Sequence, residues 1–160
     1  MKEVKETDDD GNATERYSQH GAMCWRLKRG SVEVLLVTSR DTGRWVIPKG
    51  WPCKSLPAPQ SAAKEAWEEA GVEGDVSTEP LGTYTYPKRR TPLPPLPCLV
   101  TVFPLHVSRL AEKFPERKQR KRKWFSAKKA ARLVDEPELR EILANVQGKS
   151  DLLAKISQKA

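Results

Sequence analysis

One segment near the middle of the chain constrains the fold most strongly, because both of its ends are marked. Pro57 and Pro59 stand at or before its start, where proline fits the first turn of a helix. Gly71 follows it at the position where helices commonly end in a left-handed residue. The spacing therefore predicts a helix over residues 59–70, the most sharply bounded element in the sequence.

This helix carries an unusual charge pattern. At about 100° per residue, Glu65, Glu68 and Glu69 are expected together on the face opposite Ala66 and its neighbouring alanines. Carboxylates at this spacing repel one another, and they crowd the negative end of the helix dipole, with Lys64 as the only nearby cation of the helix. A bound divalent cation would relieve this repulsion, although a solvated acidic surface is the ordinary role of such a face. Oxygen ligands without His or Cys favour magnesium, calcium or manganese over zinc.

The flanking segments alternate between strand and helix patterns. Apolar, β-branched runs predict strands over residues 21–27, 32–38, 44–48, 75–86 and 98–107, and the turn sequence Lys28 to Ser31 joins the first two as a hairpin. Ser126 is expected to cap a helix over 127–134, and a further helix is expected over 136–146. Trp124 and Phe125 are interpreted as core residues at a strand. The order of elements predicts a mixed α/β sandwich.

Three segments lack such patterns. Residues 1–17 are polar and acidic and predict a disordered tail, and residues 148–160 form a second tail of uncertain order. Residues 87–97 are too rich in proline for a strand ladder and predict an extended, polyproline-like loop. Residues 18–147 are thus expected to form one domain.

The charge balance indicates what the domain binds. Of the net charge of +8, residues 1–15 contribute −4, because two lysines face six carboxylates there, so the remaining chain carries +12. A basic body attracts nucleotides, inositol phosphates or nucleic acid, or serves solubility alone. The basic run 117–123 could likewise bind nucleic acid or serve solubility alone. It lacks interleaved aromatic residues for base stacking, so nucleic acid is the less favoured partner.

The sequence lacks the apolar segments of membrane or secreted proteins and the clustered Cys or His residues of a zinc site. No apolar run approaches the roughly 20 residues of a membrane span, and residues 1–15 contain no signal-like apolar stretch, so a cytoplasmic protein without a membrane partner is expected. Cys24, Cys53 and Cys98 are widely spaced and predict reduced thiols. His20 and His106 are unclustered, which favours structural roles. The oligomeric state does not follow from the sequence.

Residues 50–72, GWPCKSLPAPQSAAKEAWEEAGV, resemble the Nudix box: Gly, five residues, Glu, seven residues, then Arg-Glu-apolar-any-Glu-Glu-any-Gly-apolar. The positions that match are Gly50, Glu65, Ala66, Glu68, Glu69, Gly71 and Val72. Leu56 replaces the first Glu of the pattern and Lys64 replaces the Arg, two residues that support the site in the family. The resemblance implies the Nudix α/β/α sandwich with a mixed sheet, and a box folded as loop, helix and loop.

The resemblance also implies an activity, the hydrolysis of a diphosphate linkage with Mg²⁺, for which Mn²⁺ can substitute. Glu65 and Glu69 are the first choice as metal ligands, and the carbonyl of Gly50 is expected to join them. Glu68 is either a third ligand or the general base. Because two box positions are altered, the alternative is a catalytically weak module that binds RNA or a nucleotide.

The substrate side carries a second resemblance. The run TSRDTGRWVIPKG at 38–50 is similar to the diphosphoinositol and diadenosine polyphosphate hydrolase branch. The likeness implies that Ser39, Arg40 and Lys49 bind phosphate, with a solvated surface cation as the alternative for Arg40. Lys88 and the pair Arg89 and Arg90 could close over a small polyphosphorylated substrate or could only solubilise the loop that holds them.

Overall fold

The computed structural model describes residues 2–7 and 13–158 of the chain, with side chains described for residues 17–154. The strands are β1 Lys2–Thr7, β2 Ala13–Lys28, β3 Ser31–Thr38, β4 Trp45–Val46, β5 Lys49–Gly50, β6 Val72–Val76, β7 Gly82–Arg90, β8 Leu93–Leu110 and β9 Arg122–Ser126. The helices are α1 Ala58–Ala70, α2 Ala127–Leu133, α3 Pro137–Asn145, the 3₁₀ turn Gln147–Lys149 and α4 Ser150–Gln158. None of the described helices combines the length and the apolar character needed to cross a membrane.

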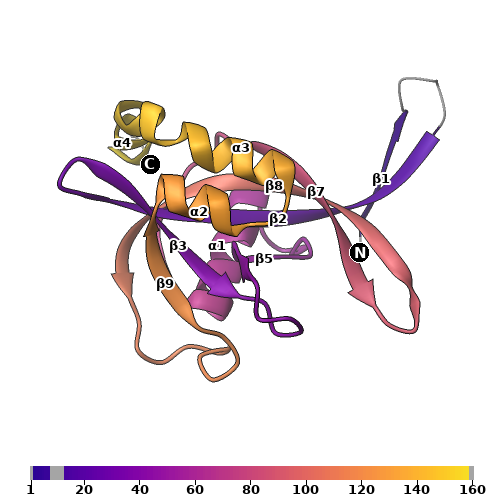
Figure 1. Cartoon of the computed structure of the whole chain (residues 1–160). Helices are drawn as coiled ribbons and strands as arrows, with labels where there is room; N and C mark the ends of the chain where they lie inside the picture. Colours follow the sequence, from indigo (N-terminus) through magenta and orange to yellow (C-terminus); the bar gives the residue numbers. More distant parts are fainter. Residues whose placement is uncertain (1, 8–12, 159–160) are drawn as a thin grey trace.

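The strands join into one mixed sheet whose main path runs β4-β3-β2-β8-β6. The two long central strands, β2 and β8, pair in parallel, while the other pairs are antiparallel. β9 adds to β3, β7 adds to β8, and the short β5 adds to β2. Helix α1 lies against one face of the sheet, and α2 and α3 lie on the other (Figure 1). The predicted α/β sandwich is confirmed.

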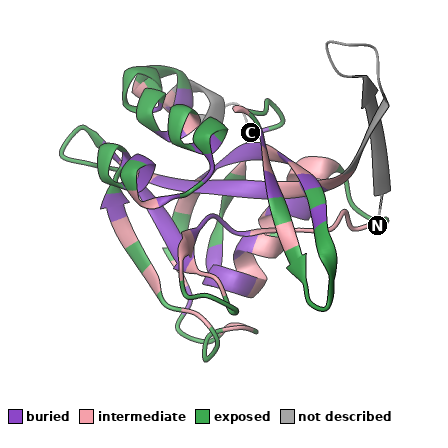
Figure 2. Ribbon diagram, turned by 45° about the vertical axis from the view of Figure 1, so that its right-hand side comes forward, coloured by how far each residue is buried: buried purple, intermediate pink, exposed green. Residues whose placement is uncertain are grey.

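Successive side chains of β2 point to opposite faces of the sheet and contribute to a hydrophobic core on each face. Ala22 and Cys24 belong to the cluster beneath α1, whereas Met23 and Trp25 belong to the larger cluster beneath α2 and α3. This follows from the two-residue period of a strand, which sends successive side chains to opposite faces. Buried residues therefore run along the central strands and the inner sides of the helices (Figure 2).

Local sequence rules account for the element ends. Gly71 ends α1 at φ 66°, and its N–H donates to the carbonyls of Ala66 and Trp67, as predicted. Arg29 and Gly30 turn the β2–β3 hairpin with φ of 53° and 79°. The Ser126 hydroxyl accepts a 3.1 Å hydrogen bond from the backbone N–H of Lys129, which caps α2 as expected.

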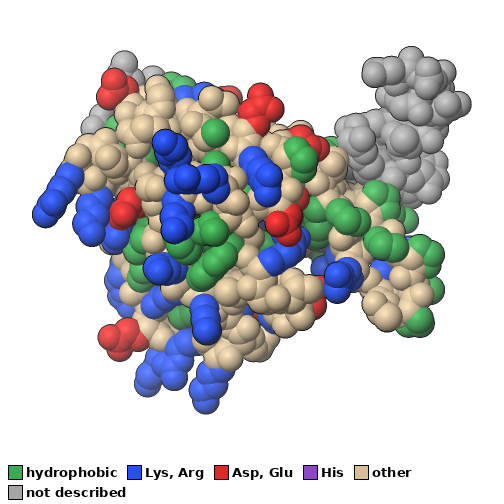
Figure 3. Space-filling view, in the orientation of Figure 1, with side chains coloured by type: hydrophobic (Ala, Val, Ile, Leu, Met, Phe, Trp, Pro, Cys, Tyr) green, Lys and Arg blue, Asp and Glu red, His purple; other side chains and the backbone are tan. Residues whose placement is uncertain are grey.

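The prediction of a polyproline-like loop over 87–97 is wrong. β7 and β8 continue as a hairpin through this segment, with Pro87 opposite Pro97 and Lys88 opposite Leu96. The ladder tolerates the prolines because β2 pairs with β8 only from Cys98 onward, so residues 93–97 have an open edge where a missing N–H costs little. Hydrophobic side chains gather on this projecting hairpin, at the right of Figure 3, while Lys and Arg side chains cover much of the body.

Both predicted tails contain secondary structure in their described residues. Residues 1 and 8–12 lie outside the described part, but β1 pairs with the start of β2. β2 continues past its last pair with β8, Tyr17 with Cys98, and β1 pairs with this extension. At the other end, α4 extends to Gln158 because Leu153 is buried in the larger core cluster.

Candidate active site

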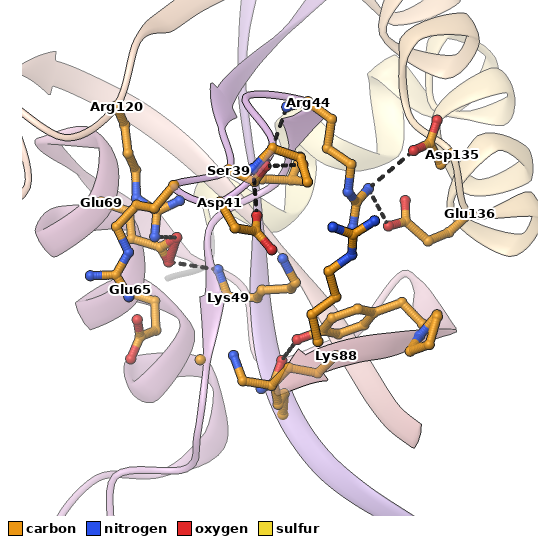
Figure 4. Close-up of a pocket in the computed structure, with 18 of the residues that line it drawn as sticks. Ser39, Asp41, Arg44, Lys49, Glu65, Glu69, Lys88, Arg120, Asp135 and Glu136 are labelled. Atoms are coloured by element: carbon orange, nitrogen blue, oxygen red, sulfur yellow. Dashed lines mark hydrogen bonds and ion pairs between the residues drawn. The ribbon is translucent and has the colours of Figure 1, made fainter. Parts of the chain in front are cut away.

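A pocket of about 990 Å³ opens between α1, the loop after β3, the β7 strand and the start of α3. Its wall is densely charged. The cations that line it are Arg40, Arg44, Lys49, Lys88, Arg89 and Arg120, and the carboxylates are Asp41, Glu65, Glu69, Glu116, Asp135 and Glu136. Figure 4 shows Glu65, Glu69 and Arg120 at one side, Arg44 with Asp135 and Glu136 at the other, and Lys49 between them.

Glu69 is buried, with an exposed fraction of 3%. One carboxylate oxygen accepts a 3.0 Å hydrogen bond from the backbone N–H of Lys49, and the other lies 3.1 Å from a guanidinium nitrogen of Arg120. Burial raises the pKa of Glu69 to about 7, against the lowering effects of Arg120 and of Lys49. The carboxylate is therefore held in one position by a strand end and a cation.

The expectation that three glutamates share an outer face is wrong for Glu69. At about 100° per residue it lies only about 60° from Ala66 around the helix, and both residues are buried. Glu68 instead projects outward and pairs with Lys64 at 2.6 Å, outside the residues that line the pocket. Helical position therefore already places the two adjacent glutamates of the box in different surroundings.

Glu65 lies against the backbone of Gly50. A Cβ atom at position 50 would stand 2.3 Å from the Glu65 carboxylate carbon, so only glycine permits this approach. Partial burial, followed by the negative charge of Glu68, raises the pKa of Glu65. Gly50 and Glu65 are thus neighbours in space although they are 15 positions apart in the sequence.

Two residues that the sequence did not single out complete this side of the pocket. Arg120 is 10% exposed and donates to Glu69, to the Glu116 carboxylate and to the carbonyl of Thr38. Glu116 is held by its own backbone N–H, which donates to the carbonyl of Glu68 at 2.9 Å. Neither position follows from a local pattern, since the segment after β8 reaches the pocket only through the tertiary fold.

The donor set fits a hard divalent cation. Magnesium takes one or two protein carboxylates and completes its shell with water and substrate phosphate. Glu65 and Glu69 line the pocket together with Gly50, and Glu65 lies against that glycine, so the two carboxylates and the Gly50 carbonyl would supply oxygen ligands of this kind. In the described part of the chain no three His, Cys, Asp or Glu side chains already converge as a metal site. Glu68 could join only by leaving Lys64.

The predicted phosphate-binding residues divide between the pocket and the surface. Ser39, Arg40, Lys49 and Arg89 line the pocket. The Lys49 ammonium lies 4.8 Å from the Tyr86 ring centre, and its pKa falls to about 8 because it is desolvated. Arg90 is exposed outside the pocket and donates to the carbonyl of Pro94, so its predicted place beside substrate is not supported.

Ser39 and Arg40 are each engaged in the resting structure. The Ser39 hydroxyl is 2.8 Å from that of Thr42 and accepts from the backbone N–H of Arg44, which holds the loop after β3 in shape. Arg40 donates to Gln119 at 3.2 Å while its side chain stays 61% exposed. Arg40 is thus a long, solvated cation at the pocket rim, and Ser39 shapes the rim itself.

Sequence reasoning missed the opposite end of the pocket. An Arg44 guanidinium nitrogen donates to the Glu136 carboxylate at 2.8 Å and lies 3.7 Å from the Asp135 carboxylate. Glu136 precedes α3, and its pairing with Arg44 spans 92 residues of sequence. No short-range signal marks such a contact.

The fold and this arrangement of charges define the class of α/β domains that handle phosphorylated small molecules between a carboxylate helix and basic loops. The family model described as the NUDIX domain matches residues 18–146. The chain therefore belongs to the Nudix hydrolase family.

Relatives and solved structures agree with this placement. Over 131 residues the chain is 36% identical to Nudix hydrolase 21, chloroplastic, of Arabidopsis thaliana, covering 80% of this chain and 60% of the relative. It is 29% identical to diphosphoinositol polyphosphate phosphohydrolase 3-alpha of Homo sapiens, covering 77% and 76%. The chain spans little more than half the length of the first Arabidopsis relatives. A C. elegans Ap4A hydrolase structure shares the fold at a TM-score of 0.58 and 19% identity, covering 86% of this chain and 98% of that one.

Proposed function

We propose that this protein hydrolyses a diphosphate linkage in a small polyphosphorylated molecule, with Mg²⁺ as its cofactor. The substrate classes are a nucleoside or dinucleoside polyphosphate and a diphosphoinositol polyphosphate. The observation that carries the proposal is the pocket, a single cavity lined both by Gly50, Glu65 and Glu69 and by the cations Lys49 and Arg89. The names of the human and C. elegans proteins support the same two substrate classes.

The residues divide into two roles in this proposal. Glu65, Glu69 and the carbonyl of Gly50 would hold the metal, which supplies charge neutralisation on the diphosphate and lowers the pKa of an attacking water. Lys49 and the guanidinium groups of Arg40 and Arg89 bind and orient the phosphates, because arginine matches phosphate oxygens in pairs.

Two carboxylates are candidates for the general base. Glu116 lines the pocket already, whereas Glu68 would have to leave Lys64 to reach it. A general base must be within hydrogen-bond reach of the water before its pKa matters. Geometry therefore favours Glu116, and the prediction from the box favours Glu68 as base or third ligand.

The alternative of an RNA-binding module finds less support in the basic run 117–123. Arg120 points into the pocket, and Arg122 donates to the carbonyl of Ala70 and lies over the Phe114 ring. The Arg117 guanidinium donates to the carbonyl of Glu112. Arg120 and Arg122 are thus turned toward the protein, and the exposed cations of the run are Arg117 and its three lysines, Lys118, Lys121 and Lys123.

A substrate panel tests the proposal directly. The protein is incubated with dinucleoside polyphosphates, capped RNA and diphosphoinositol polyphosphates, in Mg²⁺ or in EDTA, and the products are measured. Turnover that requires Mg²⁺ and is lost in Glu65→Gln supports the enzyme. Salt-sensitive RNA binding without turnover on any substrate would support the alternative.

A further inference from the structure

Arg120 is a largely buried cation whose three guanidinium nitrogens each meet a different acceptor. Its side chain is 10% exposed, although it lines the pocket. Nε donates to the Glu116 carboxylate and Nη1 donates to the carbonyl of Thr38, both at 3.1 Å. Nη2 lies 3.1 Å from Oε1 of Glu69. Because the guanidinium group is planar and its donors are fixed relative to one another, three acceptors from separate segments hold it in one orientation.

The contact with Arg120 fixes the second oxygen of a carboxylate whose first oxygen is already fixed. Oε2 of Glu69 accepts from the backbone N–H of Lys49 at 3.0 Å, and Oε1 meets Arg120 (Figure 4). An ionised carboxylate offers about four acceptor positions, so about two remain for other ligands. Within the described part of the chain, Arg120 forms ion pairs with Glu69 and Glu116 but none with Glu65. The guanidinium group therefore orients Glu69 without bridging it to Glu65, so these two carboxylates can still share a cation.

The segment that carries Arg120, residues 111–122, is fastened to the C-terminal end of α1. Two of its backbone N–H groups and one of its guanidinium groups donate to carbonyls there. The contacts join Ala111 to Gly71 at 2.8 Å, Glu116 to Glu68 at 2.9 Å and Arg122 to Ala70 at 2.7 Å. Carbonyls at a helix end have no partner inside the helix, so this segment satisfies the end of α1. Arg120 therefore reaches Glu69 from a segment that is fixed to the same turn of the helix.

We propose that Arg120 is a positioning residue of the metal site, which holds the Glu69 carboxylate in the orientation that the cation requires. The inference rests on the proposed function, in which Glu65 and Glu69 hold the metal. The box has no arginine of its own for this task, because Lys64 occupies that position and pairs with Glu68 at 2.6 Å. Arg120 acts through Glu69 and needs no contact with the substrate.

Binding of Mn²⁺ to the free protein tests the inference without turnover, with the dissociation constant measured by paramagnetic resonance. Arg120→Ala should weaken binding about ten- to a hundred-fold, the usual effect of losing a group that orients a metal ligand. Arg117→Ala is the matched control, because it removes an exposed arginine of the same segment and its hydrogen bond to the carbonyl of Glu112. It should bind Mn²⁺ as the wild type does. Unchanged affinity in Arg120→Ala would overturn the inference, and so would tighter binding, since Arg120 would then occupy the position of the metal.

Steady-state kinetics separates positioning from substrate binding. The best substrate of the panel is assayed at the Mg²⁺ concentration that half-saturates the wild type. Arg120→Ala should lower kcat about ten- to a hundred-fold and leave KM little changed. A residue that binds substrate phosphate in the ground state would instead raise KM with kcat unchanged, and that result would overturn the inference.

The conservative variant Arg120→Lys distinguishes orientation from charge. It keeps a positive charge beside Glu69, but an ammonium group cannot hold three acceptors in the fixed geometry of a guanidinium group. Mn²⁺ affinity should therefore stay below that of the wild type, while thermal unfolding in EDTA reports whether each variant is folded. This variant also carries the test if Arg120→Ala does not fold. If Arg120→Lys bound Mn²⁺ as tightly as the wild type, charge alone would be sufficient and the positioning role would be refuted.

The positioning role and the proposed function fail in different ways. Weaker Mn²⁺ binding by Arg120→Ala supports the positioning role even if no substrate of the panel is hydrolysed. Mg²⁺-dependent turnover by the wild type, with unchanged Mn²⁺ affinity and unchanged kcat in Arg120→Ala, leaves the proposed function in place and refutes the positioning role.

Discussion

Glu69→Gln should stabilise the metal-free protein at neutral and higher pH. Burial raises the pKa of Glu69 from 4.5 to about 7 in the fold, so the folded state holds a proton that the unfolded state has already released between these values. Stability then falls as pH rises through that window, by up to about 3 kcal/mol at roughly 1.4 kcal/mol per pH unit. Gln is nearly isosteric and does not ionise. Arg120 loses one acceptor but keeps Glu116 and the carbonyl of Thr38, so we expect a net gain of about 1 to 3 kcal/mol at pH 8.

The assay is urea unfolding in EDTA at pH 5, 6, 7 and 8, with the free energy of unfolding compared at each pH. The advantage of Glu69→Gln over the wild type should be small at pH 5 and should grow until about pH 7. Glu68→Gln is the control, because Glu68 forms a surface pair with Lys64 worth only a few tenths of a kcal/mol. If the difference between Glu69→Gln and the wild type were constant from pH 5 to 8, burial of an ionised carboxylate would not be the cause.

Further outcomes follow from the site and the core. Arg40→Ala should raise KM more for longer polyphosphates than for shorter ones, at about 1.5 to 3 kcal/mol per lost charge-assisted bond, with Mg²⁺ affinity unchanged in a calorimetric titration. Gly50→Ala should fold normally but weaken Mn²⁺ binding at least ten-fold by paramagnetic resonance, since the new Cβ displaces the neighbouring carboxylate. A thiol reagent should modify only Cys53 in the native protein, because a hydrogen bond from Ser55 lowers its pKa while burial raises the pKa of Cys24 and of Cys98. Reaction of all three thiols before unfolding would contradict the packed core.

Features that depend on a few consecutive residues could be predicted from the sequence. The helix over 59–70 is marked by prolines at its start and by Gly71 at its end, and the β2–β3 turn is marked by Gly30, which adopts a positive φ without steric cost. The cap at Ser126 is likewise a contact over three residues. The glycine and glutamates of the box belong to the same group, since their fixed spacing along the chain is enough to identify them.

Features that depend on distant segments could not be predicted. The hairpin over 87–97 forms because β8 has an open edge there, which only the complete sheet reveals. Glu136 meets Arg44 across 92 residues, and its charge gives no local signal because acidic residues before helices are common. The burial of Glu69 could be predicted only in part. Helical geometry already places it near Ala66, but the residues that cover it come from β5 and from the segment after β8.

The contact between Arg120 and Glu69 explains how the box can carry Leu56 and Lys64 in place of the Glu and Arg of the family pattern. In the family pattern an Arg at the position of Lys64 supports the site, but here Lys64 lies at the surface with Glu68, and Leu56 is 37% exposed. Arg120 contacts Glu69 from the segment after β8 instead, with its guanidinium fixed by Glu116 and by the carbonyl of Thr38. A cation that reaches Glu69 from outside the helix leaves the box free to vary at Leu56 and Lys64 while the buried carboxylate keeps its partner. Because Arg120 belongs to the basic run 117–123, part of the positive charge of this run lies in the pocket beside Glu69 and part lies on the surface.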